Sequence, residues 1–466
     1  MPVESEAISI NAWTGTAGAT GTLDVDAGKW GVRQHLQDVP QALAAAEPAD
    51  LRNWRDPEVG WGVVLPDTDL FSKIDRAHAL DAAPSIKTLL ASRPGAPVFR
   101  YRSTGVRGFL RRYYADGSER DVALSGPPRG IGDTKLPWYM LIAGTPNEIP
   151  WHVQYLMNAT CFTGRLDLDE EASARYVDAL VNGWKESVVS SNRPVVWAVD
   201  NGPPDITWLM RGTIADPVAA KLRADLQIGN KIAHLAGATA TASGFINAVK
   251  LAQPALIVTT SHGLTSPISD PAVMRKQLGL LVDGLGASIT PEALLDDWQP
   301  DGAIWYAHAC CSAGSDVGTS YKGLVKAGSS VEQTLEAVGA LGAAVAPLPK
   351  ALLGARKPAR AFVGQVEPTF NYTLRNPENR QVLTDSIQKA LYNHMFRREP
   401  EPVGMAFARC YRHVGELFAQ WHQLVRDVGR AVPGARETAL RVQLMAIDRQ
   451  SMVILGDPTA VLPPLT

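Results

Sequence analysis

Cysteine is scarce in this chain of 466 residues, which contains only Cys161, Cys310, Cys311 and Cys410. No CxxC pair is present, so the sequence does not support a structural zinc site. A disulfide framework is equally unsupported in a chain of this length. We therefore expect reduced thiols, no metal, no organic cofactor in the chemistry, and the cytoplasm as the default location.

Long apolar runs and an excess of charge of one sign are also missing. No stretch of 18 apolar residues occurs, so no transmembrane helix is expected. Residues 1–20 lack a basic region followed by an apolar run, so no secretory signal is expected. The formal net charge is −2, which creates no field that would draw the chain to nucleic acid or to an anionic membrane. We expect neither as a direct partner.

Several catalytic and nucleotide-binding motifs are absent. The sequence has no GxxxxGK[ST], no GxGxxG after a strand, no HExxH and no GxSxG. These absences argue against a P-loop nucleotidase, a dinucleotide-binding enzyme, a zinc peptidase of the HExxH type and a serine hydrolase with a nucleophile elbow. The composition, with 45% apolar and 20% charged residues, is that of an ordinary globular protein.

From residue 136 onward, short apolar runs alternate with segments of helical spacing. Such a rhythm predicts an α/β fold with a mostly parallel sheet that helices cover on both faces. The strands are expected at residues 138–143, 194–199, 231–236, 255–260, 302–307, 359–366 and 451–455. The helices are expected at residues 170–186, 216–226, 243–251, 291–298, 330–341 and 403–428, and Asp216 is the expected N-cap of the second.

The first 130 residues are harder to interpret. Residues 1–20 predict a loose lead-in, and residues 38–47 and 70–83 have helical spacing. Residues 95–121 predict strands joined by turns that contain glycine. No role follows from these patterns, although a regulatory or substrate-recognition part would fit here.

Two of the expected strands run directly into chemically useful residues. The strand at 255–260 leads into His262 and Gly263, and the strand at 302–307 leads into Cys310. Active sites of parallel sheets lie beyond the carboxyl ends of the strands. A thiol nucleophile needs a base, and the carbonyl that it attacks needs hydrogen-bond donors. We therefore predict His262 as general base, Cys310 as nucleophile, and the N–H groups of Gly263 and Cys310 as oxyanion donors.

Each of these residues also has an ordinary structural interpretation. A lone histidine or cysteine after a strand is more often a packed residue, and only the joint arrangement favours catalysis. Asp200 could line a specificity pocket for a basic side chain, or it could cap the following turn. His308 could line the pocket or tune the thiolate, or it could be a packed core histidine. These alternatives stay open at the level of sequence.

The stretches around His262 and Cys310 resemble the caspase-like (clan CD) cysteine peptidases. Residues 238–263 and 280–295 are similar to segments of the bacterial CHAT proteases, and residues 305–313 (WYAHACCSA) fit their Ala-Cys-x-Ser-Ala turn. Two further stretches, 136–166 and 453–461 (VILGDPTAV), look more like the gingipain family. The resemblance spans residues 136–466.

The resemblance implies a sheet of caspase–hemoglobinase type preceded by a smaller α/β subdomain. Its boundaries would be an N-terminal region at 1–130, a gingipain-like non-catalytic subdomain at 131–190 and a catalytic domain at 191–466. Register assigns the nucleophile to Cys310, and Cys311 is the alternative if the turn is shifted by one residue.

The resemblance also implies a cysteine endopeptidase that acts through a Cys-His dyad on a protein or peptide substrate. The same resemblance suggests that a protein or ligand activates the enzyme. It also suggests a role in bacterial antiviral defence or cell death. The competing hypothesis is a catalytically inactive caspase-fold scaffold or a signal-sensing binding protein.

Overall fold

The computed structural model describes residues 7–13, 18–22, 49–203, 205–396 and 399–465. The chain divides into two units, residues 1–48 and residues 49–466. In the first unit, β1 (Ala7–Trp13) pairs antiparallel with β2 (Gly18–Thr22), so the predicted loose lead-in contains paired strands. The helix predicted at 38–47 lies outside the described residues.

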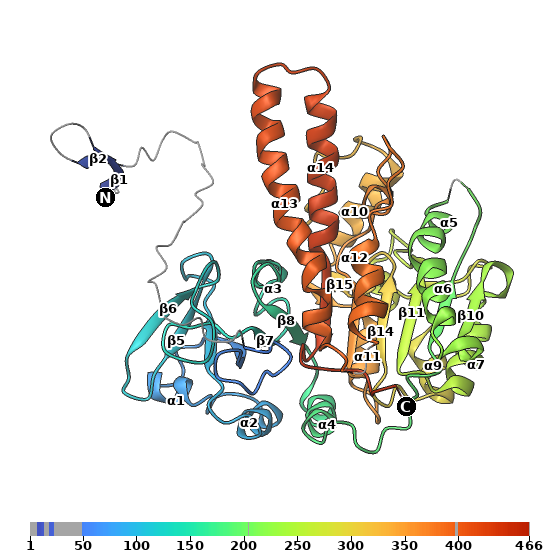
Figure 1. The fold of residues 1–466 in the computed structure, drawn as a ribbon, viewed down its shortest axis with the longest axis horizontal. Coiled ribbons are helices and arrows are strands. Elements are labelled where there is room, and N and C mark those ends of the chain that lie inside the picture. Colours follow the sequence, from blue (N-terminus) through green and yellow to red (C-terminus); the bar gives the residue numbers. More distant parts are fainter. Residues whose placement is uncertain (1–6, 14–17, 23–48, 204, 397–398, 466) are drawn as a thin grey trace. The chain divides into compact units, whose positions relative to one another are not determined.

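The second unit is built on one twelve-stranded sheet with the order β10-β9-β11-β14-β17-β18-β8-β7-β3-β4-β5-β6 (Figure 1). In chain order its strands are β3 (Trp61–Pro66), β4 (Val98–Tyr101), β5 (Phe109–Tyr113), β6 (Glu119–Ala123), β7 (Tyr139–Ala143), β8 (Phe162–Leu166), β9 (Val195–Ala198), β10 (Ala233–Ala236), β11 (Leu256–Thr260), β14 (Ile304–His308), β17 (Ala361–Gln365) and β18 (Met452–Gly456).

The sheet is mostly parallel. The β17–β18, β4–β5 and β5–β6 pairs are antiparallel, and every other pairing in the sheet is parallel. Parallel neighbours need crossover connections, and these supply the helices that cover the sheet. The predicted class, a mostly parallel α/β sheet flanked by helices, is confirmed.

The helices lie on both faces of the sheet. They are α1 (Lys73–Ala77), α2 (Pro84–Ala91), α3 (Trp151–Asn158), α4 (Glu170–Val181), α5 (Ile206–Met210), α6 (Asp216–Ala224), α7 (Ala242–Ala252), α8 (Pro271–Gln277), α9 (Pro291–Asp297), α10 (Ser330–Gly339), α11 (Pro347–Leu353), α12 (Asp385–Gln388), α13 (Val403–Gly429) and α14 (Ala435–Gln450). Short π segments at Arg211–Ala215 and Lys389–His394 follow α5 and α12.

Alternate residues of each central strand serve opposite faces. On β9, Val195 and Trp197 pack in the cluster that contains α7 and α11 side chains, whereas Val196 and Ala198 pack in the cluster with α6 and α13. Every residue of β9, β11 and β14 is buried. This double burial is why these strands appear in the sequence as continuous apolar runs.

The two halves of the sheet meet where β8 pairs with β18. A Cβ on Gly164 would lie 2.1 Å from the Gly456 carbonyl oxygen, so the backbones touch there and only glycine fits. Asp457, which follows β18, is buried, accepts a hydrogen bond from the indole of Trp61 at 3.1 Å and pairs with Arg93 at 3.2 Å. Gly164 and Asp457 belong to the stretches at 136–166 and 453–461 that resemble the gingipain family, so both stretches contribute to this junction.

The first half of the sheet draws on residues on both sides of the predicted boundary at 130. β3 pairs with β4 on one side and with β7 on the other, so residues 61–66 and 139–143 belong to one layer. The assignment of residues 131–190 as a gingipain-like subdomain and of 191–466 as the catalytic domain stays a prediction.

The helix predicted at 216–226 begins earlier than its sequence suggests. Helical backbone runs from Ile206 through the π segment to Ala224, with Pro217 inside it rather than at a first turn. Proline has no N–H to offer the carbonyl four residues before it. That carbonyl, on Thr213, instead accepts hydrogen bonds from Thr384 at 2.6 Å and Gln388 at 2.9 Å. Asp216 therefore does not cap a helix; it pairs with Arg211.

The helix predicted at 70–83 is interrupted. Ser72 and Asp75 form a capping box that starts α1, and α1 ends at Ala77. Ala79 then takes a φ of +52°, which breaks the helical path, and Pro84 opens α2.

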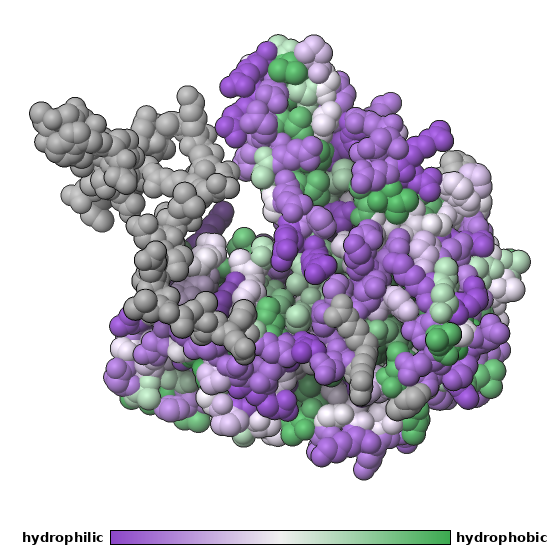
Figure 2. All heavy atoms as spheres, in the orientation of Figure 1, coloured by the Kyte–Doolittle hydropathy of each residue, from purple (hydrophilic) through white to green (hydrophobic). Residues whose placement is uncertain are grey.

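Helices α13 and α14 form an antiparallel hairpin whose far end projects beyond the sheet (Figure 1). Helix α13 matches the helix predicted at 403–428, whereas α14 was not predicted. Exposed apolar side chains stand among hydrophilic ones on the projecting part (Figure 2): Val425, Val428, Val432 and Leu440.

Candidate active site

His262 and Cys310 lie at matching positions on adjacent parallel strands. Thr260 of β11 is in register with His308 of β14, and each predicted catalytic residue follows two positions later. Parallel strands present their carboxyl ends at the same sheet edge, so the two residues emerge side by side. This is the relation that the sequence pattern predicted.

Cys310 stands in a tight turn at residues 309–312. The Ser312 N–H donates to the Ala309 carbonyl at 3.2 Å, and Cys311 takes a φ of +55°. A left-handed backbone at a residue with a side chain costs on the order of 1–2 kcal/mol. The fold tolerates this strain at the turn that presents the Cys310 thiol.

Gly263 contacts the backbone of Cys310. A Cβ at this position would lie 1.9 Å from the Cys310 carbonyl oxygen, so no larger residue fits without movement. Gly263 belongs to β12 (His262–Gly263), which pairs antiparallel with β13 (Leu281–Val282). Leu264 donates to Leu280 at 2.8 Å, which makes Gly263 a non-hydrogen-bonded position of this ladder. Its N–H therefore points away from β13.

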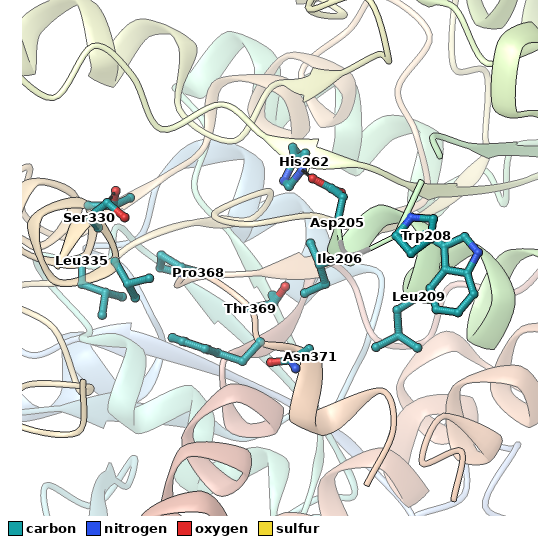
Figure 3. A pocket seen from close by; sticks show the side chains of 14 residues that line it. Asp205, Ile206, Trp208, Leu209, His262, Ser330, Leu335, Pro368, Thr369 and Asn371 are labelled. Atoms are coloured by element: carbon teal, nitrogen blue, oxygen red, sulfur yellow. Dashed lines mark hydrogen bonds and ion pairs between the residues drawn. The ribbon is translucent and has the colours of Figure 1, made fainter. Parts of the chain in front are cut away.

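Asp205, which was not among the predicted site residues, is the partner of His262. The His262 Nε2 lies 3.0 Å from Asp205 Oδ2 and 3.1 Å from Oδ1 (Figure 3). Burial would raise the pKa of Asp205, but hydrogen bonds from Thr207 and His262 together lower it. An ionised Asp205 holds the proton of the imidazole on Nε2, which leaves Nδ1 as the basic nitrogen.

Asp205 is also the N-cap of α5 and accepts the Thr207 N–H at 2.8 Å. An Asp before a short helix is an ordinary cap, and 57 residues separate it from His262. Nothing local in the sequence distinguishes a cap that also holds a histidine, so only the tertiary structure reveals it.

The Cys310 thiol is half-buried and held by the chain that follows β17. Its Sγ accepts the Thr369 N–H at 3.3 Å. Burial raises the pKa of Cys310, and the Thr369 hydrogen bonds offset part of that shift. At rest Cys310 is therefore a thiol, and it would act as a nucleophile only if a base removed its proton.

Cys311 is enclosed by apolar side chains. It is fully buried, in a cluster with Met274, Leu278, Val338 and Leu341. Burial raises its pKa well above the usual value. All four cysteines are free thiols, but Cys311 has neither the access nor the ionisation that a nucleophile needs.

Neither His308 nor Asp200, the two candidates for a specificity pocket, lines the cavity beside His262 that is described below. His308 is buried, its Nδ1 lies 2.9 Å from the Tyr306 hydroxyl, and burial lowers its pKa to about 4. Asp200 accepts the Gly202 N–H at 2.9 Å, as a turn cap does, and pairs with Arg211 at 2.8 Å.

A cavity of about 750 Å³ opens beside His262 (Figure 3). Three segments form its walls: the start of α5, the first two turns of α10, and the 368–371 segment that contains Thr369. Its lining residues are Pro203, Asp205, Ile206, Trp208, Leu209, His262, Ser330, Val331, Thr334, Leu335, Pro368, Thr369, Phe370 and Asn371.

Metal-binding geometry is absent from the described part of the chain, where no three His, Cys, Asp or Glu side chains gather closely enough to hold an ion. None of the described helices is both long and apolar enough to cross a membrane.

Comparison with known proteins adds only a distant likeness. No family model and no curated protein matches the sequence. Among solved structures, the Saccharomyces cerevisiae separase–securin complex matches with a TM-score of 0.34 and 9% identity. The match covers 73% of this chain and 16% of that chain, so this chain spans about one sixth of its length. A likeness at this level carries no argument about activity, and the resemblance to CHAT proteases and gingipains stays a prediction.

Proposed function

We propose that the chain is a cysteine endopeptidase in which Cys310 attacks the peptide bond and His262 acts as general base. The observation that carries the proposal is the pairing of β11 with β14 in a register that presents both residues at one sheet edge. The ion pair between His262 and Asp205 supports it, because a base oriented by a third group is the pattern of activated nucleophiles.

The reaction would proceed in two steps. The Cys310 Sγ bonds to the scissile carbonyl carbon while its proton passes to His262 Nδ1. His262 returns the proton to the leaving amine as the C–N bond breaks, which leaves a thioester on Cys310. Water, deprotonated by His262, then attacks the thioester carbon; the C–S bond breaks, the acid leaves, and His262 returns the proton to the Cys310 sulfur.

The oxyanion of each step needs two donors. The N–H of Gly263, which points away from β13, and the N–H of Cys310 itself would supply them. Gly263 can lie this close to the backbone of Cys310 because it has no Cβ, which would overlap the Cys310 carbonyl.

A peptide library tests the proposal. Incubation of the purified chain with a proteome-derived library, followed by mass spectrometry of the new termini, is expected to give cleavage that Cys310→Ala abolishes. Cleavage that persists in Cys310→Ala would contradict the assignment.

The inactive scaffold is the competing function. One observation favours it: the Thr369 N–H already occupies the Cys310 Sγ, whose pKa is raised. If the chain is an inactive scaffold, neither the wild type nor Cys310→Ala should cleave the library. The reactivity of Cys310 should then not depend on His262. The sequence resemblance further suggests the hypothesis of a regulated protease that cleaves one partner protein, in defence or cell death.

A further inference from the structure

The cavity beside His262 has walls that are apolar over most of their area. Ile206, Trp208 and Leu209 come from α5, Val331 and Leu335 from α10, and Pro368 and Phe370 from the segment that follows β17. Figure 3 shows these three walls around one space, with His262 and Asp205 at its edge. The polar lining consists of neutral side chains apart from His262 and Asp205.

The single carboxylate of the lining is not free to receive a basic side chain. Asp205 accepts hydrogen bonds from the Thr207 backbone and hydroxyl, and both of its oxygens lie within 3.1 Å of His262 Nε2. A lysine or arginine that entered the cavity would lose its hydration without gaining an unpaired anion in return.

The charges around the cavity point the same way. Asp200, which follows β9, is engaged by Arg211 and is not part of the lining. The guanidinium of Arg375 lies 5.9 Å from the ring centre of Trp208, so a positive charge stands beside that wall. An acidic side chain also finds no lysine or arginine in the lining itself.

The position of the cavity assigns its occupant to the acyl side of the scissile bond. Thr369, whose N–H contacts the Cys310 Sγ, lines it. The acyl group stays on that sulfur through the thioester stage, so its side chain remains next to the 368–371 segment.

We propose that this cavity takes a large apolar side chain, aromatic or long aliphatic, from the residue that supplies the scissile carbonyl. The proposal rests on the peptidase function and names its substrate class. It replaces the preference for a basic residue that Asp200 suggested in the sequence.

Peptidyl acyloxymethyl ketones that differ only in their terminal side chain test it. Leu, Phe, Arg, Lys and Asp versions would be incubated with the full chain, and modification of Cys310 would be followed by intact mass. The Leu or Phe probe is expected to react at least about tenfold faster than the charged ones.

A designed carboxylate sharpens the test. Val331 lines the cavity, is 45% exposed and lies in the first turn of α10, where a carboxylate is favourable, so Val331→Asp should fold. It is expected to slow the Leu and Phe probes and speed the Arg probe. Val273→Asp is the matched control, because Val273 is 42% exposed, lies in the first turn of α8 and does not line the cavity.

The outcomes separate the two proposals. Fastest reaction with an Arg, Lys or Asp probe in the wild type overturns the apolar assignment and leaves the peptidase standing. An unchanged profile in Val331→Asp also overturns it. If no probe modifies Cys310, the peptidase proposal fails and the apolar assignment fails with it.

Discussion

The Nε2 of His262 lies 3.0 Å from Oδ2 of Asp205, and both side chains border the cavity beside the Cys310 turn. This pair fixes which ring nitrogen carries the proton, and it ties the predicted base to the first turn of α5.

Replacing Asp205 by Asn should slow the reaction of Cys310 about a hundredfold or more. The amide keeps the N-cap role but no longer holds the proton on Nε2, and an equivalent change in a Ser-His-Asp enzyme is known to be severe. The measurement is the rate of Cys310 acylation by the fastest ketone probe. Asp270→Asn is the control, because Asp270 caps α8 in the same way away from the site. Equal rates in Asp205→Asn and the wild type would remove Asp205 from the mechanism.

Replacing Gly263 by Ala should disable the site and destabilise the chain. The added methyl group would overlap the Cys310 carbonyl, so the two backbones would have to separate. We expect loss of probe reactivity and a lower midpoint in urea denaturation. Gly415→Ala is the control, because Gly415 lies inside α13 and a Cβ there would meet open space. Alanine should stabilise that helix by roughly 1 kcal/mol. Full reactivity in Gly263→Ala would show that the close approach has no functional role.

The two adjacent cysteines should behave differently. Cys310→Ala is expected to abolish probe reactivity and peptide cleavage. Cys311→Ala is expected to keep both and to lose some stability, because a buried side chain is shortened. Activity that depends on Cys311 and survives Cys310→Ala would move the nucleophile by one residue.

The stability of the chain should depend on pH through Asp448. This buried carboxyl of α14 accepts the Phe370 N–H at 3.0 Å and the Thr373 hydroxyl at 2.6 Å, and so holds the segment beside the cavity. Burial raises its pKa to about 7 from an ordinary value near 3.8. A carboxyl whose pKa is higher in the folded state stabilises the fold at acidic pH, and that stabilisation is lost as the pH rises toward 7.

Asp448→Asn removes this dependence, since the amide stays neutral. The unfolding free energy of the wild type minus that of Asp448→Asn should fall by about 1 kcal/mol per pH unit between pH 4 and 7. Urea denaturation at several pH values measures it. Glu437→Gln, on an exposed carboxylate of the same helix, should keep the wild-type pH dependence. A difference that is flat with pH would mean that Asp448 is ionised in the folded state.

Much of the fold is visible in the sequence for a physical reason. The strands β7, β9, β11, β14, β17 and β18 are buried on both faces, so their apolar runs mark them without ambiguity. Helix α14 was not predicted because polar residues dominate its composition. The start of α5 was not predicted because Pro217 resembles the first residue of a helix. In that case a side-chain pair far along the chain satisfies the carbonyl that proline leaves free.

The site divides in the same way. The positions of His262 and Cys310 at one sheet edge could be predicted, because each residue follows a recognisable strand. Asp205 could not, because its contact with His262 joins segments 57 residues apart. The apolar character of the cavity could not be predicted either, because its walls come from three separate segments of the chain. Asp200, the acid predicted for a pocket, pairs with Arg211 instead.

Alkylation by iodoacetamide, with the labelled cysteine identified by mass spectrometry, tests whether His262 activates Cys310. We expect selective labelling of Cys310, slowed at least about tenfold in His262→Ala. His413→Ala is the matched control: His413 is 48% exposed in its side chain and pairs with Glu416, much as His262 is 43% exposed and pairs with Asp205. It should leave the rate unchanged. Slow, equal labelling of all four cysteines, or a Cys310 rate that does not change in His262→Ala, would contradict the account.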